Sequence, residues 1–278
     1  MGGYYTLYGC TIEGITEFFD NTLSSEISDY PEGIVIPIDK PYRWTSADVV
    51  RKVKFQIQKH FRLKNLKVGH AGTLDPLATG LLIICVGKAT KIAEELQSHE
   101  KEYIAEIEFG ATTPSYDLEQ EIDHHYPFSH ITKERIETVL QQFIGEQEQI
   151  PPMFSAKIVG GLRAYEYARA GETVELRKSV ITIFSMELIS FIPAADIEND
   201  GISQQRDLQR EENTVPHYCY HHSGEASDNG RPIAKIKVQC SKGTYIRSLA
   251  RDIGTTLESG AYLISLRRTA SGPFRLSE

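Results

Sequence analysis

The sequence lacks any apolar run long enough to span a bilayer, and its first 33 residues contain no lysine or arginine. A membrane-spanning helix needs about 20 apolar residues, and a secretory signal begins with basic ones. Only four cysteines occur, widely spaced at positions 10, 85, 219 and 240. That spacing indicates neither a disulfide framework nor paired zinc ligands. We therefore expect a cytoplasmic protein that has free thiols and binds no metal.

Basic residues are outnumbered overall, 30 against 38 acidic ones, and their distribution matters more than their total. The net charge is −8, but residues 1–33 and residues 194–230 contribute −6 each, which leaves +4 for the rest of the chain. Residues 49–74 hold seven lysines and arginines and no acid. Most charge runs are solvated helix faces, but a run without compensating acids can equally face phosphates. The acidic net charge therefore does not rule out a nucleic-acid partner.

The pattern of apolar residues predicts a mixture of helices and strands. Apolar residues at helical spacing follow Thr45 and Ser46, either of which can cap a helix. The same spacing recurs over 133–146 and 163–171. Residues 102–113, 178–192 and 234–240 are typical of strands. Strands often follow one another directly, which favours an α+β fold with a central mixed or antiparallel sheet flanked by helices and loops. We predict an acidic N-terminal extension (1–33), a main domain (34–278) and an acidic, flexible insertion within it (194–230).

A lone acid stands out in "KVGHAGTLDPLATGLLIICVGKATK", residues 67–91. Pro76 biases Asp75 away from helical backbone, and Gly69 and Gly72 permit tight turns or close approach to a ligand. The apolar run "LLIICV" is typical of a buried strand. The segment therefore displays a carboxylate at the edge of a core, although an isolated Asp-Pro pair more often only initiates a turn.

Four segments carry a family resemblance: "GHAGTLDPLATGLL" (69–82), "IDKPYRWTSADVV" (38–50), "QIPPMFSAKIVGGLRAYEYARAGE" (149–172) and "CSKGTYIRSLARDIG" (240–254). In these motifs the chain resembles the TruB family of bacterial tRNA pseudouridine synthases. It is similar to the short form of that family, without a C-terminal PUA-type RNA-binding domain. The resemblance covers roughly residues 34–192 and 231–275. It implies a pseudouridine synthase fold, a catalytic domain over 34–278, and the T-arm stem-loop of tRNA as partner.

The resemblance also implies an isomerase whose catalytic residue is Asp75. The reaction breaks the N1–C1′ bond of uridine and joins C5 to the same sugar carbon, so no atoms are lost and no cofactor is needed. One ionised carboxylate suffices, either as a nucleophile at C1′ or as a base that removes the C2′ proton. The sequence does not choose between these routes. A glycoside hydrolase would normally need a second carboxylate.

Similarity to the family implies roles for further residues. Arg169 is expected to keep Asp75 ionised, Tyr103 to stack on the target base, and His70 to fill the space that the flipped base leaves. The remaining expected substrate contacts are Tyr167 and Leu188 at the uracil pocket, and Lys242, Tyr245 and Arg247 in the pocket wall and at the RNA. Lys40 is expected to brace its own motif. Without the resemblance, Arg169 would be interpreted as a surface residue, Tyr103 as a packing residue and His70 as a turn residue.

Two other functions are compatible with parts of the sequence. A binding module could keep the fold and only chaperone tRNA, but it would have no chemical need for Asp75, Tyr103 and Arg169 together. Residues 217–222, "HYCYHH", could bind a metal with help from His124 and His125. Their spacing fits no closed structural zinc site, which disfavours that interpretation.

Overall fold

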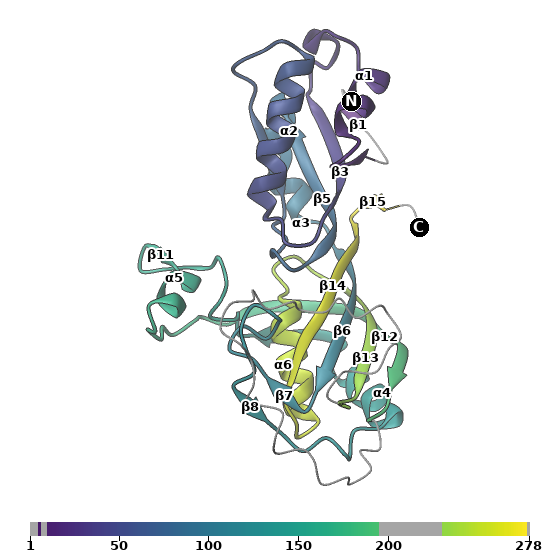
Figure 1. Ribbon diagram of the computed structural model, residues 1–278, viewed down its shortest axis with the longest axis vertical. Helices are drawn as coiled ribbons and strands as arrows, with labels where there is room; N and C mark the ends of the chain where they lie inside the picture. Colours follow the sequence, from purple (N-terminus) through teal and green to yellow (C-terminus); the bar gives the residue numbers. More distant parts are fainter. Residues whose placement is uncertain (1–4, 7–9, 195–229, 277–278) are drawn as a thin grey trace, which may run out of the picture.

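The computed structural model describes residues 5–6, 10–194 and 230–276, and its centre is a mixed sheet (Figure 1). The strand order is β1 (Tyr5–Thr6), β3 (Ile34–Lys40), β5 (Thr79–Val86), β14 (Ala261–Ser271), β6 (Lys101–Phe109), β13 (Ile233–Cys240), β12 (Ser179–Ile192) and β9 (Gly145–Gln149). Three short strands join it: β2 (Cys10–Thr11) pairs with β3, β4 (Val68–Ala71) with β5, and β15 (Phe274–Arg275) with β14. The β5–β14 junction is parallel, whereas β14–β6–β13–β12–β9 is antiparallel throughout. The predicted α+β class with a mixed central sheet is confirmed.

Helices flank this sheet. They are α1 (Ile15–Thr22), α2 (Ser46–His60), α3 (Ala93–Ser98), α4 (Lys133–Gln142), α5 (Ala164–Arg169) and α6 (Ile246–Thr256), with 3₁₀ turns η1 (Ile27–Asp29) and η2 (Gly87–Ile92). Two small hairpins are separate from the main sheet, β7 (Ala111–Thr112) with β8 (His124–His125) and β10 (Ile158–Val159) with β11 (Leu162–Arg163). In Figure 1, α2 accompanies β3 and β5 in the upper half, α6 and α4 accompany the lower half, and β11 and α5 stand apart from the body.

Strand β5 is the buried strand that its apolar run predicts, and its side chains belong to two hydrophobic clusters, one on each face of the sheet. Leu82 and Ile84 face a large cluster that also contains side chains of α2 and α6. Leu81 and Ile83 face a smaller cluster with Leu96 of α3 on the other side of the sheet. Alternate strand residues point to opposite faces, so a continuous apolar run is what a strand covered on both faces requires. Helices α2 and α6 therefore pack against the same face of the sheet.

Helix α2 begins where the sequence indicates a cap. Thr45 is the N-cap, and it forms a reciprocal capping box with Asp48. Val49, Val53 and Ile57 recur every four residues and are fully buried. This spacing places all three on the inner side of the helix. The remaining, basic side of α2 is left to solvent.

The acidic N-terminal segment is joined to the main sheet. Strands β1 and β2 add in parallel to the outer edge of β3. Ile12, Ile15 and Phe19 lie in the same core cluster as α2. His60 at the end of α2 binds back to α1 and the loop after it, with Nδ1 3.0 Å from Asp20 Oδ1 and Nε2 2.8 Å from the Ser24 carbonyl oxygen. The sequence patterns did not predict this attachment. The predicted insertion at 194–230 lies, apart from its end residues, outside the described residues.

Candidate active site

The loop that carries Asp75 is held on both sides of the acid. The Ser46 hydroxyl accepts a hydrogen bond from Leu74 N (2.9 Å) and donates one to Leu74 O (3.0 Å). Pro76 O accepts from the backbone N–H of Arg43 (2.9 Å) and from Lys40 Nζ (3.2 Å). The start of α2 and the end of β3 thus fix the backbone of Asp75, as a positioned catalytic group requires.

Lys40 lies beneath this loop rather than at the surface. Its side chain is fully buried, and Nζ also donates to Pro41 O (3.0 Å) and Trp44 O (2.6 Å). Burial lowers the pKa of Lys40 to about 8, and the negative charge of Asp75 partly opposes that shift. The contacts with Pro41 and Trp44 brace its own motif, as predicted, and the contact with Pro76 ties that motif to the Asp75 loop.

Arg247 is the ionic partner of Asp75. Its Nη2 lies 2.8 Å from Asp75 Oδ2, and its side chain is 5% exposed, whereas that of Asp75 is 41% exposed. The same guanidinium donates to Ser115 O (3.2 Å) and Phe154 O (2.9 Å). Burial opposes the charge of Arg247, but Asp75 and Asp117 raise its pKa. A fixed cation therefore faces a carboxylate that a substrate can still reach.

The prediction that Arg169 is this partner is wrong. Arg169 ends the short helix α5, with its side chain 66% exposed and Nη2 3.4 Å from Glu119 Oε1. Its companion Tyr167 donates its hydroxyl hydrogen to Val159 O (3.2 Å) within the same projecting unit. Both residues lie within the motif 149–172, and helical spacing alone did not reveal that α5 stands away from the sheet.

A second carboxylate, Asp117, shares Arg247 and was not predicted. Asp117 Oδ2 lies 3.5 Å from Arg247 Nε, and the Asp117 side chain is 9% exposed. Thr113 fixes its backbone, accepting from Asp117 N (3.1 Å) and donating to Asp117 O (2.7 Å). Burial raises the pKa of Asp117, and the charge of Arg247 partly opposes that shift. The irregular loop "TTPSYDLEQE" offers no periodicity from which burial could be read.

An open pocket lies at these charges, with about 300 Å³ of empty space that includes open solvent. Its lining residues are Asp75, Leu77, Ala78, Asp117, Leu118, Arg247, Leu263, Ile264, Ser265 and Leu266. Apolar walls with a few convergent polar groups are typical of sites for planar organic ligands. Leu266 of β14 belongs to this lining. Leu188 does not, because it lies on β12 opposite Ile236 and packs against the core.

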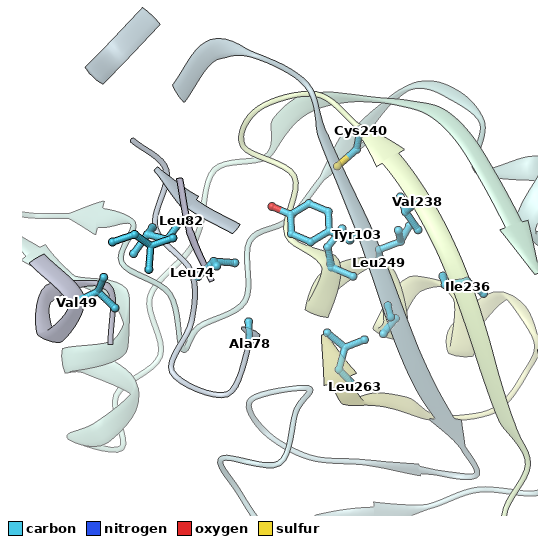
Figure 2. Packing of buried hydrophobic residues seen from close by; sticks show 14 of the residues in the cluster. Val49, Leu74, Ala78, Leu82, Tyr103, Ile236, Val238, Cys240, Leu249 and Leu263 are labelled. Carbon is cyan, nitrogen blue, oxygen red and sulfur yellow. The ribbon is translucent and has the colours of Figure 1, made fainter. Parts of the chain in front are cut away.

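Two predicted tyrosines lie in the electrostatic environment of Asp75. Tyr103 of β6 is 8% exposed and lies in the same hydrophobic cluster as Leu74, the neighbour of Asp75 (Figure 2). Burial raises the pKa of Tyr103, Arg268 lowers it and Asp75 raises it. Tyr245, at the start of α6, is half-buried, and burial together with Asp75 raises its pKa. Both phenols are therefore neutral at neutral pH.

His70 and Lys242 have different surroundings. His70 lies on β4, and its Nδ1 is buried and has no hydrogen-bond partner among the described residues. Burial and the charge of Arg268 lower the pKa of His70, so the ring is neutral at neutral pH. Lys242 is exposed in the turn between β13 and α6. Because the His70 ring carries no charge, it can enter a stack of bases without the cost of desolvating a charge.

The metal-binding interpretation finds no ligand cluster within the described ranges. No group of three or more His, Cys, Asp or Glu side chains there could hold a metal ion. Residues 217–222 lie outside those ranges. His124 and His125 lie on β8, where His125 Nδ1 is 3.0 Å from Arg231 Nη2. Among the helices that the structure describes, none is long and apolar enough to cross a membrane.

Solved structures with this fold define a class of enzyme. A chain of "Crystal Structure of a Cbf5-Nop10-Gar1 Complex" is 28% identical with a TM-score of 0.54, covering 88% of this chain and 50% of that one. A chain of "Structure of H/ACA RNP bound to a substrate RNA containing 2'-deoxyuridine" is 26% identical with a TM-score of 0.51, covering 88% of this chain and 49% of that one. This chain thus spans about half of each. The fold is that of the pseudouridine synthases, as predicted.

The sequence comparisons identify the family within that class. Residues 58–201 match the family model described as TruB family pseudouridylate synthase (N terminal domain). The tRNA pseudouridine synthase B of Phocaeicola vulgatus is 49% identical over 250 residues, which cover 90% of each chain. That of Bacteroides thetaiotaomicron is 47% identical over 250 residues, again 90% of each chain. The chain belongs to the TruB family of pseudouridylate synthases, which confirms the resemblance seen in its four motifs.

Proposed function

We propose that the protein isomerises a uridine in the T-arm loop of tRNA, at position 55, to pseudouridine. One observation carries the proposal: a rigidly held Asp75 meets the buried Arg247 at 2.8 Å at the edge of an apolar pocket. The names of the relatives, tRNA pseudouridine synthase B, point to the same reaction.

Arg247 and Asp75 supply the first step. The Arg247 guanidinium, within hydrogen-bond distance, pairs with the Asp75 carboxylate when the base covers the pocket and excludes water. Asp75 then either attacks C1′ or removes the C2′ proton, and in both cases the N1–C1′ bond breaks. The base departs with the electrons of the N1–C1′ bond and turns within the pocket. C5 then bonds to C1′ as the Asp75–C1′ ester bond breaks or, in the second route, as C2′ regains the proton that Asp75 removed. Loss of the C5 proton and protonation of N1 complete the isomerisation without a cofactor.

Two neutral aromatic side chains, His70 and Tyr103, are placed to extrude and bind the base. A uridine stacked in a loop must be extruded before Asp75 can reach its sugar, at a cost of a few kcal/mol. His70 is neutral and partly buried on β4, which suits it to fill the vacated position in the stack. Tyr103 keeps its proton and so can stack on the base and take part in the transfer of the C5 proton.

A tRNA chaperone without catalysis is a weaker candidate. Such a protein would gain nothing from burying Arg247, whose guanidinium needs two carboxylates and two carbonyl oxygens to satisfy it. Burying such a charge has a desolvation cost even when it is paired, and a module that only binds RNA has no chemical use for the arrangement.

Substitution of the acid tests the proposal. Asp75→Asn keeps the shape and removes the charge, so we expect no pseudouridine under single turnover while tRNA affinity stays within about tenfold. Asp39→Asn is a matched control, because Asp39 also pairs with an arginine, Arg267 Nη2 at 2.6 Å, but does not line the pocket. It should keep its activity within about threefold. Measurable turnover by the Asp75 variant would refute the proposal.

A further inference from the structure

The outer side of α2 carries an aromatic residue among cations. Phe55 is 65% exposed, and its helical neighbours at i−4, i−3, i−1 and i+4 are Arg51, Lys52, Lys54 and Lys59, all exposed. We name these five residues the α2 patch. Residues three and four apart adjoin on a helix, so Arg51, Lys52 and Lys59 lie beside the ring, whereas Lys54 points to one side of it.

The charges of the α2 patch are poorly compensated. Arg51 pairs with Asp48 in the first turn of the helix. Within the described part of the chain, Lys52, Lys54 and Lys59 form no ion pair. Single exposed apolar residues are common on protein surfaces. A phenyl ring with uncompensated cations on several sides is instead the combination that proteins use for single-stranded or looped RNA, where aromatic faces stack and cations meet phosphates.

The patch begins near the pocket. Ser46, the first residue of α2, is hydrogen-bonded to Leu74 beside Asp75. At 1.5 Å per residue, positions 51 to 59 lie roughly 8–20 Å along the helix axis from that contact. A nucleic-acid strand advances on the order of 3.4 Å per nucleotide. The patch therefore lies within a few nucleotides of a uridine held at Asp75.

We propose that the α2 patch binds the RNA strand that flanks the reacting uridine, with Lys52 and Lys59 at phosphates and Phe55 against a base or ribose. This inference rests on the proposed function, because that function supplies the polyanion. Charge complementarity selects RNA as the occupant: the cluster is positive, and it adjoins a pocket that receives a nucleotide. An acidic protein partner is the competing occupant, and it would leave RNA affinity unchanged when the patch is altered.

Neutralising two lysines tests the phosphate contacts. Affinity of Lys52→Gln/Lys59→Gln for a T-arm hairpin should fall about tenfold near 0.1 M salt, and the slope of log affinity against log salt should flatten by about 1.4–1.8, at 0.7–0.9 per phosphate. The single-turnover rate at saturating RNA should stay within about threefold. The matched control is Lys133→Gln/Arg135→Gln, which removes the same charge from α4 at the opposite end of the molecule (Figure 1). Its affinity and slope should match the unmodified protein.

Phe55→Ala tests the ring independently, and it leaves the core intact because Phe55 is largely exposed. Affinity should again fall about tenfold, with the salt slope unchanged, because stacking releases no counterions. Unaltered RNA affinity in both the double variant and Phe55→Ala would overturn the proposal, as would equal losses in the α4 control. If the unmodified protein binds RNA through the α2 patch but forms no pseudouridine, the proposed function is wrong while RNA binding by the patch remains supported.

Discussion

The side-chain amide of Gln149 holds both backbone groups of Tyr245. Its Oε1 accepts from Tyr245 N at 2.8 Å, and its Nε2 donates to Tyr245 O at 3.1 Å. Gln149 is 3% exposed and ends β9, just before the segment that leads to α5. Two residues after Tyr245, Arg247 donates to Phe154 O of that same segment. The position of Arg247 therefore depends on the end of β9.

We predict that Gln149→Ala lowers kcat by about tenfold to a hundredfold with little change in KM. Loss of the amide frees the backbone before Arg247, and a small misplacement of a charged group impairs catalysis more than binding. Steady-state kinetics measure the split between kcat and KM. Gln147→Ala is the matched control on the same strand, since Gln147 Nε2 only donates to Phe143 O. A variant that merely melts earlier, with unchanged kcat, would contradict this role.

The two candidate arginines can be separated directly. Arg247→Lys keeps the charge but loses the fork that reaches two carboxylates and two carbonyl oxygens, so the rate should fall by about a hundredfold or more. Arg169→Lys, on the exposed end of α5, should change the rate by no more than about threefold. Single-turnover assays at saturating RNA measure both. The opposite ranking would contradict the role proposed for Arg247.

The acid limb of the pH profile should depend on Asp117. Its pKa is raised above the ordinary aspartate value, so as the pH falls it gains its proton before an ordinary carboxyl does, and Arg247 then loses one of its two anionic partners. The acid limb of kcat/KM in Asp117→Asn should therefore move to lower pH, with a rate at neutral pH about tenfold below that of the unmodified enzyme. Asp252→Asn removes an acid that pairs with Arg251 on α6, and it should leave the profile unchanged. An unmoved acid limb in Asp117→Asn would remove Asp117 from the site.

The extent of tRNA recognition depends on how many phosphates the protein can contact. The basic segment 49–74 can neutralise only a handful of them, which one stem-loop can supply. We expect an isolated T-arm hairpin to be modified with a specificity constant within about tenfold of full tRNA, a gap of roughly 1.4 kcal/mol. Parallel assays of the two RNAs with one enzyme preparation give the ratio. A hairpin that is worse by a thousandfold would mean that the protein reads another arm of the tRNA.

Local patterns revealed much of the fold and the identity of the central acid. A few neighbouring residues suffice to predict the apolar run of β5, the cap of α2 and the position of Asp75 at the edge of the core. Arg247 was assigned to the site but not as the partner of Asp75, although it carries a signal that sequence reasoning could have used. It lies among Ile246, Ala250 and Gly254 on the buried side of α6, and a buried arginine requires an anion. Asp117 carries no such signal, because its burial depends on how an irregular loop folds over α6.

The N-terminal strands have a consequence for how the protein keeps itself from aggregating. A sheet that ends in unpaired backbone N–H and C=O groups can template the addition of further strands from other chains. At one end, β1 and β2 pair with β3 and replace its edge by two strands of two residues each, which are too short to template much pairing. At the other end, β9 carries the exposed charges of Glu146 and Glu148. Shortening the chain at its N-terminus would therefore do more than remove acidic residues, because it would uncover an apolar strand, "IVIPIDK", whose backbone is ready to pair with a second molecule.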